Sequence, residues 1–546
     1  MKKALEAFAA HYPDLAELQV NCVTEEGRNQ YVMILTNQNT GSALSKPALY
    51  VDGNIHAGEV TSSMCAMHTI DYLLTNYGTD PEVTSVLDNT VFYVIPRVSP
   101  DGAEVYLTTE KTLRSVNREY LFEKGGVRVE DLDGDGVVRM MRIPTSYGAW
   151  KTDPADGSTM VLRGPSDTEG EFYDIYPEGV LIPFDGDENL RSEENPWGLD
   201  FNRNFPLGWF PDSRQPGAGK YPLSNPETKA VVDFALSHSN IGGAAIGHTS
   251  GGLLLYPPGT KPSKDAPSGD IESMVAIANM GKEELGYLPM NIFDTFMSDQ
   301  TNYDSGALDD WFYQSQGIPA YTVEFWDLDS HAGVPFNWNE RAKETPAEEI
   351  RRFNACVKWV KENAPEYYVD WKTFDHPFFG KVEIGGFNYK FTHQNPPGKF
   401  LVKECEGSTR FNIRFAKSLP KLSVDSFEAE KLGEGLYQIT AVVGNKGFLP
   451  TNLTDEALSL NISKPVTVCL SGAEILSGVP EAKIGNLSGY SRTVTGAFFY
   501  GNLTTQKNAP ARKKLTWIVR AEPRTRITLT ASQEKAGKVG AELVTG

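Results

Sequence analysis

PALYVDGNIHAGEV, residues 47–60, decides the fold class, because a buried strand runs straight into a polar turn and a helix. Residues 47–55 are typical of a buried strand, and over 59–77 the apolar residues recur at helical spacing. A second strand at 90–98, TVFYVIPRV, ends at the turn Ser-Pro-Asp-Gly. Strands that alternate with amphipathic helices predict an α/β domain, a mixed sheet flanked by helices on both faces.

This alternation continues to about residue 375 and then stops. Further strands are expected at 241–248 and 320–325, and further helices at 225–239, 269–287, 307–316 and 346–364. Beyond that point, short β-branched and aromatic runs such as GLYQITAVVGN lie between Gly, Pro and Asn turns. We therefore predict an α/β domain over residues 1–375 and an all-β, sandwich-like domain over 376–546.

The first domain carries an acidic insertion at about residues 148–200, which is rich in Gly and Pro and shows no clear periodicity. It holds thirteen Asp and Glu against three Lys and Arg. Such an excess of one charge is typical of a solvated loop, and a loop is expected here.

The composition argues against several classes of protein. The 546 residues are 40% hydrophobic and carry a formal net charge of −20, which is typical of a globular chain and disfavours nucleic acid as a partner. No apolar run approaches the roughly 18–20 residues that span a bilayer, so no membrane partner is expected. The five cysteines form no CxxC pair, which argues against a disulfide scaffold. No signal peptide is recognised, and a cytoplasmic location is the default expectation.

The polar turn after the first strand offers a metal site. His56 and Glu59 are three residues apart at the C-terminal end of a strand, where open α/β sheets bind ligands. His248 closes the strand at 241–248 and is the best candidate for a third ligand, with a purely structural histidine as the alternative. Zinc accepts two imidazoles and a carboxylate and keeps a fourth position for water.

These residues belong to a longer ordered set of motifs. The set comprises His-Ala-Gly-Glu at 56–59, Asp-Phe-Asn-Arg-Asn-Phe at 200–205, His248, Tyr303, Asp310–Trp311 and Thr-Val-Glu-Phe at 322–325. In this order the motifs resemble those of the zinc metallocarboxypeptidases of the carboxypeptidase A/B type, over roughly residues 10–365. The resemblance implies the mixed α/β fold of that family.

The resemblance also implies a role for each catalytic position. His56, Glu59 and His248 would bind one Zn²⁺. Glu324 would act as the general base, which takes a proton from water and passes it to the leaving amine. Arg142, in the segment Arg-Met-Met-Arg, would stabilise the oxyanion of the tetrahedral intermediate.

The remaining positions concern the substrate. Asn202 and Arg203 would hold its free α-carboxylate, since a planar guanidinium binds carboxylates in bidentate fashion. Asp200 would accept a hydrogen bond from a zinc-bound imidazole, and Tyr303 would close over the substrate. One departure from the compact pancreatic members is Gly58, which stands where they have an arginine.

Asp309 bears on specificity. It precedes the Asp-Trp pair, at a position that is apolar in carboxypeptidase A-like members and acidic in carboxypeptidase B-like ones. The resemblance therefore implies a pocket for a C-terminal Lys or Arg. The alternative is an exposed acid that stabilises the start of a helix.

Asp131, Asp133 and Asp135 lie in a DLDGDG turn that looks like the start of a calcium loop. The twelfth position from Asp131 is Arg142, where an EF-hand needs a bidentate glutamate, so the turn is not an EF-hand. A tight acidic turn is the favoured interpretation, and a single Ca²⁺ is the alternative.

The expected function is a zinc-dependent removal of single residues from peptides with a free C-terminal carboxylate. Two alternatives stay open: a zinc amidohydrolase acting on N-acyl amino acids or cell-wall peptides, and a non-catalytic peptide-binding protein. The presence of His56, Glu59, His248 and Glu324 together favours an enzyme.

Overall fold

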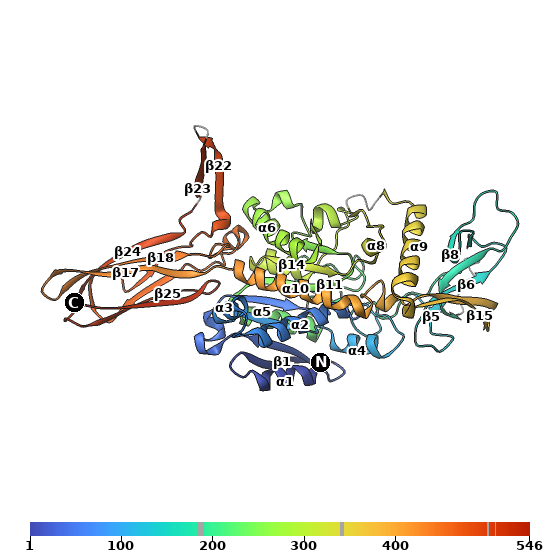
Figure 1. Cartoon of the computed structure of the whole chain (residues 1–546), viewed down its shortest axis with the longest axis horizontal. Coiled ribbons are helices and arrows are strands. Elements are labelled where there is room, and N and C mark those ends of the chain that lie inside the picture. Colours follow the sequence, from blue (N-terminus) through green and yellow to red (C-terminus); the bar gives the residue numbers. More distant parts are fainter. Residues whose placement is uncertain (183–189, 339–342, 500–501, 508) are drawn as a thin grey trace.

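The computed structural model describes residues 1–546 except 183–189, 339–342, 500–501 and 508. Three bodies follow one another along the long axis (Figure 1): a β-sandwich on the left, a central α/β domain, and a small β lobe on the right. Within the described part of the chain, no helix is long and apolar enough to cross a bilayer. All five cysteines are free thiols.

The central domain is built on an eight-stranded sheet with the order β1-β2-β4-β3-β11-β14-β12-β13. Its strands are β1 (Ala16–Val23), β2 (Asn29–Leu35), β3 (Ala48–Asp52), β4 (Val91–Ile95), β11 (Ile241–Thr249), β12 (Leu253–Tyr256), β13 (Leu288–Asn291) and β14 (Ala320–Phe325). The four central strands are mutually parallel, whereas β1, β2 and β12 each have antiparallel partners. The predicted mixed sheet is confirmed.

Helices cover this sheet, and capping residues mark where some of them begin. They are α1 (Lys2–His11), α2 (Val60–Asn76), α3 (Pro81–Asn89), α4 (Pro100–Thr108), α5 (Pro226–Ser237), α6 (Ser268–Leu285), α7 (Leu308–Asp310), α8 (Leu328–His331), α9 (Pro346–Asn363) and α10 (Gly398–Ser418). Thr345 and Glu348 form a capping box at the start of α9, and Asp80 caps α3 ahead of Pro81.

The predicted boundary at residues 375 and 376 needs correction, because a hairpin crosses it. Strand β15 (Tyr368–His376) turns directly into β16 (Gly380–Phe387). Helix α10 then returns to the central domain, where Phe411 and Phe415 pack their rings edge-on against Tyr321 of β14. The central domain therefore extends through α10, and the sandwich begins only at β17 (Leu422–Gly433).

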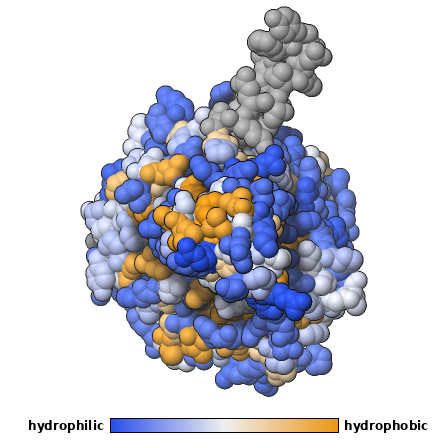
Figure 2. Space-filling view, turned by 90° about the vertical axis from the view of Figure 1, so that its left-hand side faces the viewer, coloured by the Kyte–Doolittle hydropathy of each residue, from blue (hydrophilic) through white to orange (hydrophobic). Residues whose placement is uncertain are grey.

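The sandwich consists of two four-stranded antiparallel sheets, which confirms the predicted all-β architecture of the C-terminal part. One sheet has the order β17-β18-β24-β20 and the other β21-β19-β25-β26. The other strands of the sandwich are β18 (Leu436–Asn445), β19 (Thr467–Ser471), β20 (Glu474–Ser477), β21 (Glu481–Lys483), β24 (Arg512–Arg520), β25 (Arg526–Gln533) and β26 (Gly537–Val544). Their alternating residues meet around Trp517 in one core. Apolar side chains also gather on the outer end of the sandwich (Figure 2).

Two smaller elements accompany the sandwich. The short helix α11 (Asp455–Ser459) lies between β18 and β19 in the chain, and its Ala457 is buried. The hairpin of β22 (Thr493–Phe499) and β23 (Asn502–Lys507) projects away from both sheets (Figure 1).

The acidic insertion is not the loop that its composition predicts. Part of it forms a six-stranded sheet with the order β15-β16-β6-β9-β7-β8, beside a two-stranded sheet of β5 and β10. Besides β15 and β16, the strands of these two sheets are β5 (Gly126–Val129), β6 (Met140–Pro144), β7 (Trp150–Asp153), β8 (Asp156–Leu162), β9 (Tyr173–Pro177) and β10 (Gly179–Ile182). We call residues 126–182 and 368–387 the accessory lobe. Residues 183–189 of the predicted insertion lie outside the described residues.

Candidate active site

The metal-ligand candidates stand on neighbouring strands of the central sheet. His56 and Glu59 lie in the loop between β3 and α2, and His248 is near the end of β11. Glu324 of β14 is the register partner of His248 in the parallel β11–β14 pair. Paired residues of adjacent strands point to the same face, so Glu324 lies beside the histidine. The strand ends thus bring together four residues from three parts of the sequence.

The β3–α2 loop is held in shape by its own hydrogen bonds. Asn54 adopts a left-handed backbone conformation with φ +60°, and its side-chain amide donates to the carbonyl oxygens of His56 and Ala57. A Cβ on Gly53 would lie 2.6 Å from the Ser62 backbone, so only glycine allows α2 to approach this closely. The loop therefore presents His56 and Glu59 from a fixed position.

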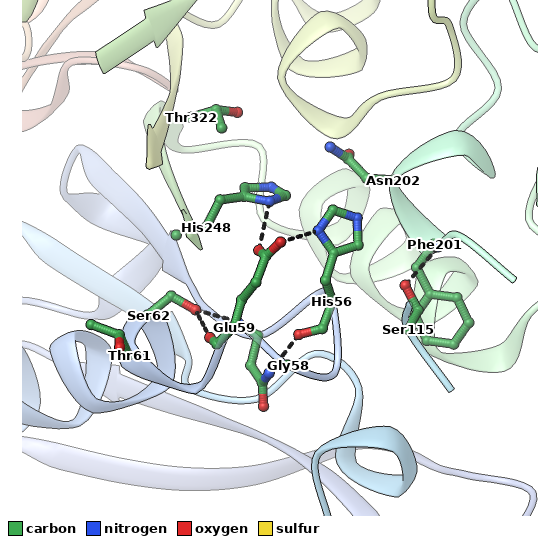
Figure 3. Close-up of polar contacts among 12 residues, drawn as sticks. His56, Gly58, Glu59, Thr61, Ser62, Ser115, Phe201, Asn202, His248 and Thr322 are labelled. Carbon is green, nitrogen blue, oxygen red and sulfur yellow. Dashed lines mark hydrogen bonds and ion pairs between the residues drawn. The ribbon is translucent and has the colours of Figure 1, made fainter. Parts of the chain in front are cut away.

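The two histidines and Glu59 converge on one point. Nδ1 of His56 lies 2.8 Å from Oε1 of Glu59, and Nδ1 of His248 lies 2.9 Å from Oε2 of the same carboxylate. All three residues are buried, and their candidate ligand atoms lie within 4.8 Å of one another. Figure 3 shows both imidazoles turned toward the carboxylate.

This donor set fits a zinc ion. Nε2 of His56 lies 3.0 Å from the Asp200 carboxylate, which accepts a hydrogen bond from the N–H of that nitrogen, so the lone pair is on Nδ1. That lone pair faces an oxygen of Glu59, which is also an acceptor, so a proton or a cation must lie between them. A carboxylate that orients a metal-binding imidazole is the usual support of a zinc site.

Arg114 completes the charge arrangement around the ligands. Its Nε donates to Asp200 Oδ2 at 2.7 Å, and a terminal nitrogen lies 3.7 Å from Glu59 Oε1. Burial alone would raise the pKa of Asp200, but Arg114 and His56 hold that pKa well below its ordinary value. Asp200 therefore stays ionised and keeps His56 oriented.

Glu324 has the protonation behaviour of a general base. Burial raises the pKa of its carboxyl group to about 7, against the opposing effect of His248, and the Glu59 charge adds to the increase. A base whose pKa lies near neutrality can both accept and return a proton at the working pH. The sequence placed Glu324 at a strand end, and the structure brings it to the metal ligands.

The structure does not bring Arg142 to the metal ligands, and we withdraw its predicted role. Arg142 lies on β6 in the accessory lobe, where its Nε donates to Glu383 at 2.8 Å. Its guanidinium lies over the rings of Tyr173 and Trp371, with centroid distances of 4.7 and 4.6 Å. It acts as the cation of the lobe's own packing.

Arg114 is the arginine that sequence reasoning missed. It lies 28 residues before Arg142, on the segment that leads from α4 to the accessory lobe. The neighbouring Ser115 accepts a hydrogen bond from the Phe201 backbone (Figure 3), which joins the Arg114 segment to the segment containing Asp200. The signal available in the sequence was Arg114 in the TLRS segment, upstream of all extra residues.

Asn202 and Arg203 lie in the short turn η3 (Phe201–Arg203) beside the metal ligands. Asn202 Oδ1 accepts from the Leu308 backbone at 3.0 Å, and the Asn202 side chain lies above the imidazoles across from Thr322 (Figure 3). Arg203 donates to Asp304 at 2.8 Å and keeps a fifth of its side chain exposed. Tyr303 packs its ring near Phe210 and Phe293 instead of over the ligands.

Asp309 is buried, so it is not the exposed helix-terminal acid of the alternative interpretation. It is 4% exposed, and its Oδ2 accepts from the Thr322 hydroxyl at 2.7 Å. Thr322 lies two residues before Glu324 on β14, which places Asp309 on the same side of the sheet as the base. Among the described residues, no Lys, Arg or His forms an ion pair with Asp309.

The calcium alternative gains no support. Asp131 and Asp133 do approach Glu178, but the carboxylates are already used. Asp131 accepts from the backbones of Gly134 and Gly136, and Asp135 pairs with Arg139. Glu178 accepts three backbone N–H groups of the same turn. These bonds are those of a tight acidic turn.

Comparison with known families gives two matches along the chain. The family described as zinc carboxypeptidase matches residues 1–134 and 183–375, which is more than half of the chain. A domain of unknown function matches residues 421–544, the sandwich. Residues 135–182, which form most of the accessory lobe, are matched by neither.

Individual relatives cover parts of the chain. Human carboxypeptidase D is 35% identical over 234 residues, which are 40% of this chain and 17% of that protein. Mouse carboxypeptidase A4 is 24% identical over 326 residues, which are 59% of this chain and 60% of that protein. The structure of carboxypeptidase A from Helicoverpa armigera is 16% identical with a TM-score of 0.38, covering 66% of this chain and 72% of that one.

Proposed function

Because the chain belongs to the zinc carboxypeptidase family, we propose that it hydrolyses the C-terminal peptide bond of peptides. The observation that carries the proposal is the convergence of His56, Glu59 and His248 beside a base on the adjacent strand, Glu324. Zinc, when bound by the three ligands, would supply a Lewis acid that polarises the scissile carbonyl and acidifies water.

Two residues support the proton and charge movements. Glu324, with its pKa near neutrality, takes the proton of the attacking water and delivers it to the leaving amine. Arg114 presents its guanidinium beside the metal ligands, so it stabilises negative charge that develops on the carbonyl oxygen. We thus propose Arg114 in the role that the sequence suggested for Arg142.

Asn202 and Arg203 support recognition of a free C-terminus. Both lie next to Asp200, which contacts His56, and the carboxylate that Arg203 binds belongs to the half-exposed Asp304. A substrate carboxylate would replace Asp304 as the partner of the guanidinium. This pair favours substrates with a free α-carboxylate over amides that lack one. N-acyl amino acids also carry that group, so the experiment below separates them from peptides.

A preference for basic C-terminal residues follows from Asp309. A buried carboxylate without a cationic partner is costly, and a Lys or Arg side chain of the substrate supplies that partner. We propose that Asp309 lies at the base of the pocket for the C-terminal side chain. Tyr303 stays a prediction as a closing residue, and the cytoplasmic location also stays a prediction.

Mass spectrometry of a mixed peptide pool tests the function. Each peptide is supplied with a free and with an amidated C-terminus, with and without a zinc chelator, and Glu324→Gln serves as the inactive control. Chelator-sensitive loss of single residues from free-acid peptides alone is the expected result. Trimming of N-acyl amino acids or cell-wall peptides alone would favour the amidohydrolase, and peptide binding without any cleavage would favour the binding protein.

A further inference from the structure

A large cavity lies between the central domain and the accessory lobe. Its volume is about 1170 Å³, on the scale of the largest ligand pockets. One wall comes from lobe strands, including Met140, Trp150, Met160 and Trp371, and the other from α9 and the segment after β16. In Figure 1 this junction lies to the right of the central sheet, where α9 stands beside the lobe.

The lining of the cavity is mainly apolar and aromatic. The ring centroids of Phe353 of α9 and Phe387 of β16 lie 5.5 Å apart with the rings tilted by 38°, and both line the cavity together with the two lobe tryptophans. The three Lys and Arg residues in its wall have partners: Lys390 donates to backbone carbonyls of residues 106 and 109, Arg139 pairs with Asp135, and Arg114 donates to Asp200. The surface that remains for a ligand therefore suits apolar side chains better than charged groups.

The wall of the cavity borders the candidate active site. Arg114 lines it and also contacts Asp200 and Glu59. Gln394 lines it as well and lies against Gly58 in the metal-ligand loop, where a Cβ would be 2.6 Å from the Gln394 side chain. The wall of the cavity thus reaches the loop that carries His56 and Glu59.

The position of the carboxylate-binding residues gives the substrate a direction. Asn202, Arg203 and Asp309 contact the α7 region, and they would take the C-terminal residue. Arg114, beside the scissile carbonyl, forms the boundary between that pocket and the cavity. The part of the peptide that precedes the scissile bond therefore leaves the catalytic centre toward the cavity.

We propose that this cavity binds the substrate residues on the N-terminal side of the scissile bond and selects large apolar or aromatic ones. The inference rests on the proposed function and deepens it. Three lobe residues of the wall, Met140, Trp150 and Met160, lie within residues 135–182, outside the match to the zinc carboxypeptidase family. The specificity is accordingly a property of this chain's own insertion.

Two hexapeptides with the same two C-terminal residues test the proposal. One has Phe and Leu upstream of that dipeptide, and the other has Ser and Gln. We expect kcat/KM to favour the apolar peptide on the order of tenfold or more, the usual discrimination of an apolar pocket. If neither of these peptides nor any other free-acid peptide is cleaved, the proposed function is refuted. Equal cleavage of both would leave that function standing and overturn the cavity proposal.

Matched variants locate the selectivity. Phe353→Ser alters a cavity phenylalanine that is 45% exposed, and Phe378→Ser alters one in the β15–β16 turn that is 63% exposed and does not line the cavity. The ratio of the two kcat/KM values should fall toward one in Phe353→Ser and stay unchanged in Phe378→Ser. Calorimetric titration of both peptides into Glu324→Gln provides a second measurement. Equal affinities there, or a ratio unchanged by Phe353→Ser, would contradict the proposal.

Discussion

Replacing Arg114 by methionine tests whether Arg114, and not the predicted Arg142, stabilises the oxyanion. Arg114 donates to Asp200 at 2.7 Å and lies 3.7 Å from Glu59, whereas Arg142 binds Glu383 in the accessory lobe. Arg114→Met and Arg142→Met remove the same group from the two places. Each variant therefore serves as the control for the other.

The expected loss of kcat in Arg114→Met follows from the negative charge on the carbonyl oxygen that the guanidinium would stabilise. Deleting one oxyanion donor costs about 2.7–4 kcal/mol, which is about 10²–10³ in kcat. The three metal ligands stay in place, so bound zinc should remain near one per chain. Arg142→Met should lower kcat less than about threefold on a short substrate, because Arg142 lies in the lobe and its ion pair is with Glu383.

The assay is steady-state hydrolysis of an N-acylated dipeptide, with zinc content from elemental analysis and folding from circular dichroism below the melting temperature. The reasoning is refuted if Arg114→Met keeps more than about a tenth of the wild-type kcat while holding zinc. It is refuted equally if Arg142→Met loses as much kcat as Arg114→Met without unfolding.

Four further outcomes are expected. Chelation should abolish hydrolysis and lower the melting temperature, and Zn²⁺ should restore both, because a cation separates the lone pair of His56 from the Glu59 carboxylate. A melting temperature that the chelator does not change would contradict this. Asp309→Asn should lower kcat/KM for C-terminal Lys and Arg by about 10–100-fold, relative to Leu, in a competition assay. Burial and the neighbouring Asp309 raise the pKa of Asp310 to about 7 from 3.8, so the folded state binds more protons, and stability should fall as the pH rises from 4 to 7. Asp310→Asn should flatten that dependence in pH-resolved denaturant titrations. Gly53→Ala should cost about 1–3 kcal/mol and weaken zinc binding, whereas Gly398→Ala, with open space at its Cβ, should do neither.

The convergence of the metal-ligand candidates could be predicted because their signal is local. His56 and Glu59 share one turn, His248 and Glu324 end strands that their apolar residues identify, and β pairing then fixes their proximity. Asp200 could be placed by the same motif order. The physical reason is that strand ends of one parallel sheet must meet at one edge.

The accessory lobe and Arg114 could not be placed in this way. The lobe sheet combines β6 and β9 with β15 and β16, which follow about 200 residues later, so neither segment alone shows a buried face. Arg142 was predicted from the likeness of the segment Arg-Met-Met-Arg to the family's arginine-bearing stretch, whereas the proximity of Arg114 to Asp200 is a contact between residues 86 positions apart. Contacts between segments far apart in the sequence determine both the lobe sheet and the position of Arg114.

Helix α10 was missed for a different reason. Its buried face includes Gly407, Ser408, Thr409 and Asn412, so the apolar stripe that reveals a helix is interrupted. Gly407 lies against Leu285 of α6, where a side chain would not fit, and His68 of α2 pairs with Thr409. Because α10 packs closely against α2 and α6, its buried face carries small and polar residues in place of some apolar ones.

The return of the chain through α10 has a consequence for how such proteins can be rearranged. Asn395, just before that helix, donates to the Gly58 carbonyl at 2.7 Å and accepts from the Thr61 backbone at 2.9 Å, so it fastens the loop that holds His56 and Glu59. A gene fragment that stops at residue 375 would lack this fastening and the cover over α2. Recombination that exchanges the hydrolytic module for another would therefore need its junction after α10, near residue 420.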